Sequence, residues 1–179
     1  MAIITLAQAK AQLGIDPDDT SDDDELQLYL EAATIAVEKA RGQVIDVRPV
    51  IDDLDLTGAA TFVLRSSPAI ELTSVEAVDG SQTWDITALH LYGQSGRVSV
   101  LSGPPVTGLV SVSYTAGMQP IPDNYVLAAL IIVQHLWETQ RGSMGVQLGG
   151  EAEAYTPGRG FAIPRRAIEL LGLSLPGVA

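Results

Sequence analysis

The sequence contains no cysteine, which excludes disulfide bonds, thiolate metal sites and a thiol nucleophile. Aromatic residues make up only 5% of its 179 residues, so a hydrophobic core must be built mainly from Ala, Val, Leu and Ile. Hydrophobic residues nevertheless account for 46% of the chain and charged residues for 18%, which is typical of a folded globular protein.

Basic residues are scarce. Ten Lys and Arg residues stand against 22 Asp and Glu residues, and the formal net charge is −12. Nucleic-acid binding through phosphate contacts requires clustered basic side chains, so a protein that grips nucleic acid is not expected. An acidic surface past which nucleic acid slides without sticking remains compatible with this charge.

Catalytic and nucleotide-binding motifs are also missing: there is no P-loop, dinucleotide fingerprint, HEXXH or GXSXG pattern. The two histidines, His90 and His135, lie in a predicted strand and a predicted helix without a catalytic motif around them. The acidic stretch 16–25 fails the EF-hand pattern, because Ser21 and Gln27 occupy the positions of the required Gly and Glu. We predict no catalytic, cofactor-binding or metal site. The hypothesis that the protein is an enzyme therefore has little support in the sequence.

No apolar run is long enough to cross a membrane. The most apolar stretch is "NYVLAALIIVQHLWETQRG" (124–142), whose strictly apolar part extends only from 126 to 133, and a span needs about twenty residues. A helix that is apolar on every side is expected to be buried all round, either as a central core helix or by a second subunit. The residues predicted for this core or subunit contact are Val126, Leu127, Leu130, Ile131, Val133, Leu136 and Trp137.

Helical patterns occupy both ends of the chain. Thr5 and Gln8 form a capping-box pattern for a short helix that Gly14 ends. Ser21 or Asp22 caps a longer helix that closes at Gly42. A third helix is predicted over 124–141, with Asp123 as its cap and Gly142 as its end, and a short fourth helix has Pro164 in its first turn.

Short runs rich in β-branched residues, separated by Gly, Pro, Asp and Ser, lie between these helices. The predicted strands are 60–66, 72–80, 83–86, 89–93, 96–103 and 108–117. Hairpin turns are predicted at Asp79-Gly80 and around "YGQSG" (92–96).

These patterns predict an α+β fold, with a helical bundle of three to four helices and an inserted small antiparallel β domain, either a sandwich or a barrel. The helical domain is assigned to 1–43 and 119–142, and the β domain to 44–118. The remainder, 143–179, is interpreted as a flexible Gly-rich arm followed by the short C-terminal helix.

Two motifs in this order resemble the head–tail connector (adaptor) proteins of long-tailed bacteriophages. The first is "TLAQAKAQLGI" followed by an acidic turn and an Ala-rich helix, which is similar to the family's "TLEEAK–HLRI" pattern. The second is "YTAGMQPIP" leading into an apolar helix that ends in "WETQR". The matching residues are Thr5, Ala9, Lys10, Leu13, Ile15, Tyr114, Thr115, Ala116, Gly117, Pro120, Pro122, Trp137, Glu138 and Arg141. The closing "IPRRAIELLGL" is similar to the family's Pro-led, Leu-rich last helix.

The resemblance implies a structural virion protein made in the host bacterial cytoplasm and located in the neck. Such adaptors form a ring, usually of twelve subunits, that binds the portal protein and extends the channel for double-stranded DNA without reading its sequence. They also bind a downstream stopper or tail-terminator protein. The family's C-terminal segment reaches the portal, which implies portal docking by 161–173. The portal-docking residues are Phe161, Ile163, Pro164, Arg165, Arg166, Ile168, Leu170 and Leu171.

An alternative remains open at this point. The β domain could be a binding module that recognises a carbohydrate or a protein partner, with a ligand patch around Trp84 and Tyr92.

Overall fold

The computed structural model describes residues 2–140 and 163–172, so the predicted arm at 143–160 and the predicted portal-docking residue Phe161 lie outside the described residues. The chain divides into two compact units. We call Gly42–Ile121 the β unit, and Ala2–Arg41 with the chain from Pro122 onward the helical unit. The prediction of an α+β fold with a helical part and a small β domain is confirmed.

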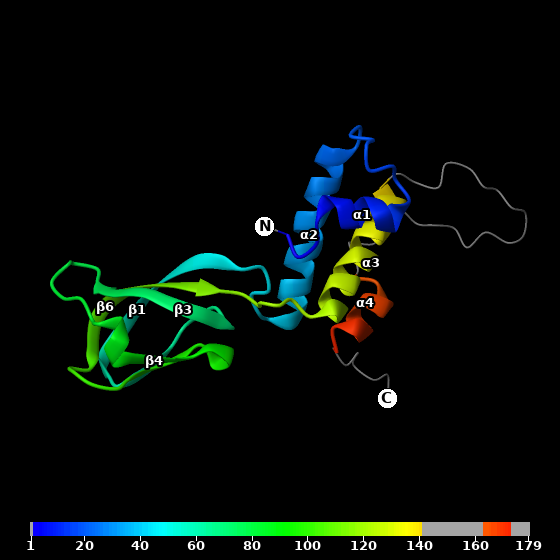
Figure 1. Ribbon diagram of the computed structural model, residues 1–179. Coiled ribbons are helices and arrows are strands. Elements are labelled where there is room, and N and C mark those ends of the chain that lie inside the picture. The colour runs from blue at the N-terminus through cyan, green and yellow to red at the C-terminus, as the bar shows by residue number, and fades with distance from the viewer. Residues whose placement is uncertain (1, 141–162, 173–179) are drawn as a thin grey trace, which may run out of the picture. The chain divides into compact units, whose positions relative to one another are not determined.

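The described part of the helical unit contains four α-helices (Figure 1). They are α1 Leu6–Leu13, α2 Asp23–Arg41, α3 Asp123–Gln140 and α4 Arg165–Leu170. The predicted capping box is present, because the Gln8 amide donates to Thr5 Oγ1 at 3.2 Å and the Thr5 amide donates to Gln8 Oε1 at 2.8 Å. Gly14 ends α1 in the left-handed conformation, as expected. Asp123 is the first residue of α3 rather than its cap.

The helices pack through small and branched side chains. Helix α3 contacts α1, α2 and α4, and α1 also contacts α2. The buried residues of α2 include Leu26, Leu30, Ala33 and Val37, and those of α3 include Ala128, Ala129, Ile132 and Val133. Alanine at these contacts allows two helix backbones to approach closely, which compensates for the scarcity of aromatic side chains.

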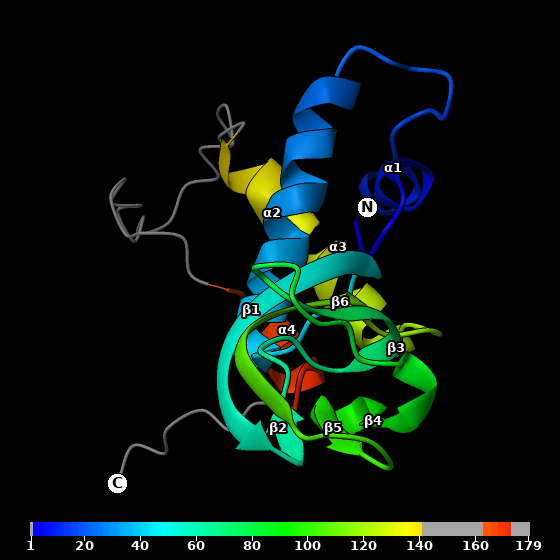
Figure 2. The same cartoon turned by 90° about the vertical axis from the view of Figure 1, so that its left-hand side faces the viewer.

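The β unit contains two three-stranded antiparallel sheets (Figure 2). We call the sheet of order β1-β6-β3 sheet A and the sheet of order β2-β5-β4 sheet B. The strands are β1 Arg48–Ala59, β2 Thr61–Val63, β3 Ala69–Ala77, β4 Leu89–Tyr92, β5 Arg97–Val100 and β6 Val106–Ala116. The predicted hairpin through "YGQSG" is β4–β5, whose connection includes a 3-10 turn and the left-handed Gly96.

Two details of the strand prediction are wrong. Strand β1, the longest in the unit, was not among the predicted strands, because three aspartates between 52 and 55 mask its alternation. The predicted strand 83–86 is reduced to one bridge between Glu76 and Thr83, and a 3-10 helix then begins at Ile86. The turn at Asp79-Gly80 is present, with the Gly80 amide donating to the Ala77 carbonyl at 2.8 Å.

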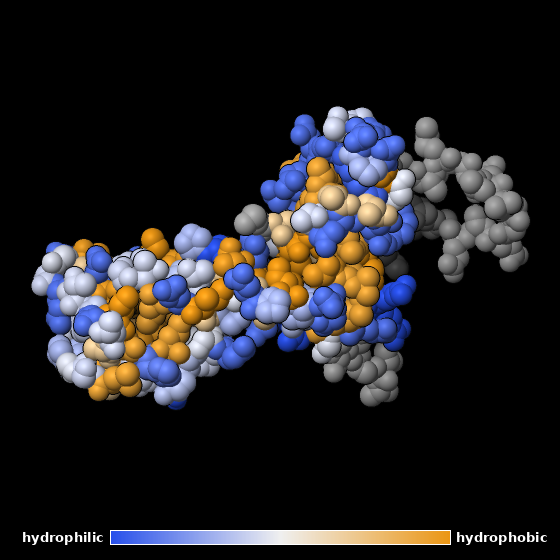
Figure 3. Space-filling model, in the orientation of Figure 1, coloured by the Kyte–Doolittle hydropathy of each residue, from blue (hydrophilic) through white to orange (hydrophobic). Residues whose placement is uncertain are grey.

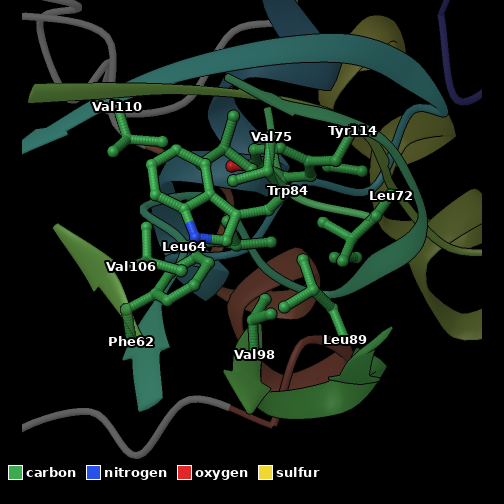
Figure 4. Packing of buried hydrophobic residues seen from close by; sticks show 13 residues of the cluster. Phe62, Leu64, Leu72, Val75, Trp84, Leu89, Val98, Val106, Val110 and Tyr114 are labelled. Carbon is green, nitrogen blue, oxygen red and sulfur yellow. The ribbon is translucent and has the colours of Figure 1, made fainter. Parts of the chain in front are cut away.

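One hydrophobic core lies between the two sheets (Figure 4). Sheet A contributes Val110, Val112 and Tyr114 among others, and sheet B contributes Phe62, Val98 and Leu89. Since side chains alternate along a strand, the remaining residues of each sheet point away from this core. The β unit therefore carries two outer faces, one on each sheet, on opposite sides of its core.

Candidate functional site

The residues of α3 that were predicted for a core or subunit contact lie in two environments. Val133 and Leu136 are buried within the chain, so they belong to the core of the helical unit. Leu127 is 41% exposed, and Val126, Leu130, Ile131 and Trp137 are half-buried. The other three helices thus cover one side of α3 and leave its other side partly open.

The open side of α3 carries Leu127, Leu130 and Ile131, which we call the α3 patch. In Figure 3 an apolar area lies over α3 between α1 and α4. These residues are three and four positions apart, so they form one stripe on the helix. A contiguous exposed apolar stripe of this kind is typical of a surface that another protein covers.

A second apolar surface lies in the helical unit, and it was not among the predicted contact surfaces. A groove of about 680 Å³ separates the last turns of α2 from the end of α3. It is lined by Ala32, Ile35, Ala36, Lys39, Ala40, Leu136, Gln140 and Ile163. Ile35 is 63% exposed although it lies in the middle of α2. Its exposure could have been derived from the helical wheel, because Leu28, Ala32, Ile35 and Lys39 share one face.

The short helix α4 is held by two polar side chains at its C-terminal end. The Arg41 guanidinium donates to the Leu171 carbonyl at 2.8 Å, and the Asn124 amide donates to the Leu170 carbonyl at 2.8 Å. The last carbonyls of a helix have no partner within the helix, so these bonds satisfy them. Arg41 also lies over the Tyr125 ring, 5.5 Å from its centroid. The sequence patterns did not predict a contact of Arg41 or Asn124 with α4.

The predicted portal-docking residues do not form one open surface. Arg165 and Arg166 are exposed, whereas Leu171 is only 1% exposed and is part of the helical core. The others that the structure describes, Ile163, Pro164, Ile168 and Leu170, are half-buried. The exposed charged residues of α4 are Arg165, Arg166 and Glu169, which together carry one net positive charge, and Arg165 Nε lies 3.4 Å from Glu169 Oε1.

The motif residue Lys10 is buried against the acidic turn. Its ammonium group lies 2.6 Å from the Asp23 carboxylate and donates to the carbonyls of Asp19 at 2.7 Å and Pro17 at 3.3 Å. One cation thus ties α1, the turn and the start of α2 together. The acidic turn has a structural role in closing this loop, and no group of metal-ligating side chains occurs among the described residues.

The second motif, "YTAG", is the end of β6. The Tyr114 hydroxyl donates to Asp52 Oδ2 at 2.7 Å and accepts from the Ser66 amide at 3.0 Å, and the Arg65 amide donates to the same Asp52 oxygen at 2.7 Å. Burial, together with the hydrogen bond to Asp52, raises the pKa of the Tyr114 phenol above its ordinary value of 10.0. This network joins β1 and β6 to the segment after β2.

The histidines have ordinary surroundings. His90 is exposed on β4 with its ring 4.5 Å from the Tyr92 ring in an edge-to-face arrangement, and His135 is half-buried in α3. Trp84 is 6% exposed inside the core of the β unit (Figure 4), so the suggested ligand patch around Trp84 and Tyr92 is wrong. In the part of the chain that the structure describes, no helix is long and apolar enough to cross a membrane.

Comparison with known proteins gives one family and one set of related folds. The family described as "HCP: Head completion protein" matches residues 2–173 of this chain. No curated protein matches the sequence.

The solved structures that share the fold include three chains from gene transfer agent (GTA) particles. A chain in the neck of an empty GTA particle, computed with C6 symmetry, superposes with a TM-score of 0.66 at 18% identity, covering 99% of this chain and 93% of that chain. A chain from the virion of a native gene transfer agent (GTA) particle gives 0.66 at 18% identity, covering 98% and 92%. A chain in the neck of the native GTA particle, computed with C12 symmetry, gives 0.60 at 18% identity, covering 97% and 91%.

Proposed function

This chain belongs to the head completion protein family, and from that premise we propose that it is a structural protein of the virion neck that joins the phage head to the tail. The structural neighbours from GTA necks and virions support this location. The proposed role needs surfaces for other proteins and no reaction chemistry.

The finer proposal is a ring of twelve copies that docks on the portal protein. The observation that carries it is the α3 patch, an apolar stripe that is partly open among the residues the structure describes. Ring closure requires heterologous contacts, in which one surface of each copy meets a different surface of the next. The C6 and C12 symmetries of the neighbouring neck structures support a count of twelve.

Docking on the portal is assigned to the segment 161–173. Within its described part, the exposed Arg165 and Arg166 are the side chains available for an acidic partner surface, while Leu171 anchors the segment to its own helical unit. We expect the opposite end of the ring to bind the stopper or tail-terminator protein.

The ring would also extend the DNA channel. The net charge of −12 supports a wall that repels phosphates, so that double-stranded DNA passes without sequence-specific binding. The alternative of a carbohydrate- or protein-binding β module has lost its supporting feature, because Trp84 is in the core.

Electron microscopy of this protein mixed with portal rings from the same genome tests the proposal. We expect a second ring, coaxial with the portal and attached at one end. Arg165→Glu with Arg166→Glu should reduce the fraction of portals that carry this ring, because it replaces the two exposed cations proposed to meet an acidic partner surface with two anions. Portals that remain bare at high concentrations of the wild-type protein would overturn the proposed function.

A further inference from the structure

The two outer faces of the β unit differ in charge. On sheet A, the outward residues of the central strand β6 are small hydroxyl residues over most of its length: Ser111, Ser113 and Thr115. Carboxylates flank this row on both neighbouring strands. In register with Ser111 stand Asp53 on β1 and Glu76 on β3, and in register with Thr115 stands Glu71 on β3.

We call Asp53, Asp55, Glu71 and Glu76 the acidic face. All four are exposed, and none of their carboxylates forms a hydrogen bond or an ion pair within residues 2–140 and 163–172. Arg65 is a cation beside this face, because its guanidinium donates to the Asp53 carbonyl at 2.8 Å. One guanidinium against four carboxylates leaves this face strongly negative.

The outer face of sheet B carries no carboxylate on its strands. Its outward residues are Thr61, Val63, His90, Tyr92, Arg97 and Ser99. Arg97 stands directly opposite Tyr92, and its guanidinium lies 3.9 Å from the centroid of the Tyr92 ring. His90 contacts the same ring.

This arrangement preorganises the Arg97 side chain for binding to a partner. Stacking on Tyr92 restricts the guanidinium, so less side-chain entropy is lost when it binds. Among the described residues, none accepts a hydrogen bond from the Arg97 guanidinium. A planar guanidinium with free N–H groups matches a carboxylate in geometry and in charge. We call Arg97 with Tyr92 and His90 the arginine face.

We propose that the arginine face of one copy contacts the acidic face of the next copy in the ring. The inference rests on the proposed ring and names the surfaces by which neighbouring β units meet. A heterologous contact between ring subunits requires two complementary surfaces on opposite sides of one subunit. Each copy then presents one face to one neighbour and the other face to the other neighbour. The α3 patch supplies apolar burial to the subunit contact. The charged contact sets the orientation of neighbouring copies, because single exposed ion pairs add little affinity.

A second copy fits the arginine face better than nucleic acid does. Binding to a phosphate backbone depends on several clustered cations, and this face has one arginine in a chain of net charge −12. The acidic face offers four carboxylates. Because every copy carries both faces, each arginine face in a ring has an acidic face of a neighbouring copy beside it.

Charge reversal tests the contact directly. Variant one is Arg97→Glu, and variant two combines Asp53→Lys with Glu76→Lys. The control combines Asp18→Lys with Glu31→Lys, which makes the same charge change as variant two at exposed positions of the helical unit. Each variant is added to portal rings at low salt, and the fraction of portals carrying a complete ring is counted by electron microscopy. Circular dichroism and thermal unfolding verify that each variant folds.

We expect each reversal alone to lower ring occupancy by at least about tenfold, because like charges then face each other. An equal mixture of the two variants should restore rings, since alternating copies pair the carboxylate introduced at position 97 with the lysines introduced at positions 53 and 76. The control should behave as wild type.

Two results would overturn the contact while leaving the proposed function intact: rings of Arg97→Glu as abundant as those of wild type, or an equal loss in the control. Arg97-dependent binding of duplex DNA with unchanged rings would assign the arginine face to nucleic acid and would also overturn it. Bare portals with the wild-type protein would instead count against the ring itself.

Discussion

At the scale of single residues, Gly117 of the "YTAG" motif lies where a side chain has no room. A Cβ there would lie 2.6 Å from the Val47 Cα atom, and φ is +136°, which L residues rarely adopt. The contact is with backbone, so no side-chain rotation can relieve it. The motif's glycine is therefore explained by the close passage of the Val47 segment past the end of β6.

We predict that Gly117→Ala lowers the free energy of unfolding by about 3 kcal/mol or more, because conformational strain and a backbone clash act together. Gly103→Ala is the matched control. Gly103 also has a positive φ, of +92°, but nothing lies within 4 Å of its added Cβ, so about 1 kcal/mol of strain is expected. Urea unfolding of both variants measures the difference, and equal losses would contradict the steric argument.

Tyr114 stabilises the β unit through its hydroxyl. Tyr114→Phe removes the bond to Asp52 and leaves the Ser66 amide without this acceptor, so we predict a loss of about 1–2 kcal/mol in the free energy of unfolding. Tyr92→Phe, on an exposed strand, is the control and should change stability by less than about 0.5 kcal/mol. Urea unfolding of both variants measures the two losses, and a Tyr114→Phe protein as stable as its control would contradict the prediction.

The same residue gives a pH dependence. The pKa of Tyr114 is raised in the folded state, so folding favours the protonated phenol. The resulting stability is fully present below the unfolded pKa of about 10 and is lost as the pH rises from there through the folded pKa. Unfolding free energies measured between about pH 8 and 11 should fall less steeply for Tyr114→Phe than for wild type. Parallel curves would show that this phenol is not responsible.

At the scale of secondary-structure elements, Lys10 joins α1 to the acidic turn and to α2. Lys10→Met keeps the length of the side chain but removes the charge that meets Asp23 and the carbonyls of Pro17 and Asp19. We predict a loss of about 1–3 kcal/mol in the free energy of unfolding, because the three partners lose a buried cation. The loss stays within this range because Asp23 keeps partial access to water.

Hydrogen exchange and urea unfolding check this prediction for Lys10→Met, with Lys39→Met as the control at an exposed position of α2. The amides of residues 16–22 should exchange faster in the Lys10 variant only. Unchanged exchange in that turn would indicate that its own Asx-type hydrogen bonds, such as the one from the Ser21 amide to the Asp19 carboxylate at 3.0 Å, are sufficient to hold it.

At the scale of the whole molecule, the α3 patch should control assembly without controlling folding. We predict that Leu127→Asp lowers the monomer's free energy of unfolding by no more than about 2 kcal/mol, since Leu127 is 41% exposed, but lowers ring occupancy on the portal by at least about tenfold. Leu101→Asp is the control, because Leu101 is a 66% exposed leucine that follows β5 and lies outside both the patch and the strands. If both variants assemble equally well, the α3 patch is not a subunit contact.

Local patterns alone were enough for several features. The Thr5–Gln8 capping box, the glycine that ends α1, the apolar helix and the β4–β5 hairpin all follow from interactions between residues close in the chain. The α+β class follows from the change of hydrophobic period between these segments. These features could be predicted because their chemistry is complete within one turn of helix or one hairpin.

The amino-acid order was sufficient for most of the elements, the acidic balance and the family resemblance, whereas long-range packing determines which side of each element is covered. Strand β1 is stable despite its aspartates because β6 pairs with it and Tyr114 binds Asp52. Trp84 is buried and the α3 patch is not, although both are apolar. Burial and the direction in which charges face depend on contacts between residues far apart in the chain, which local periodicity does not encode.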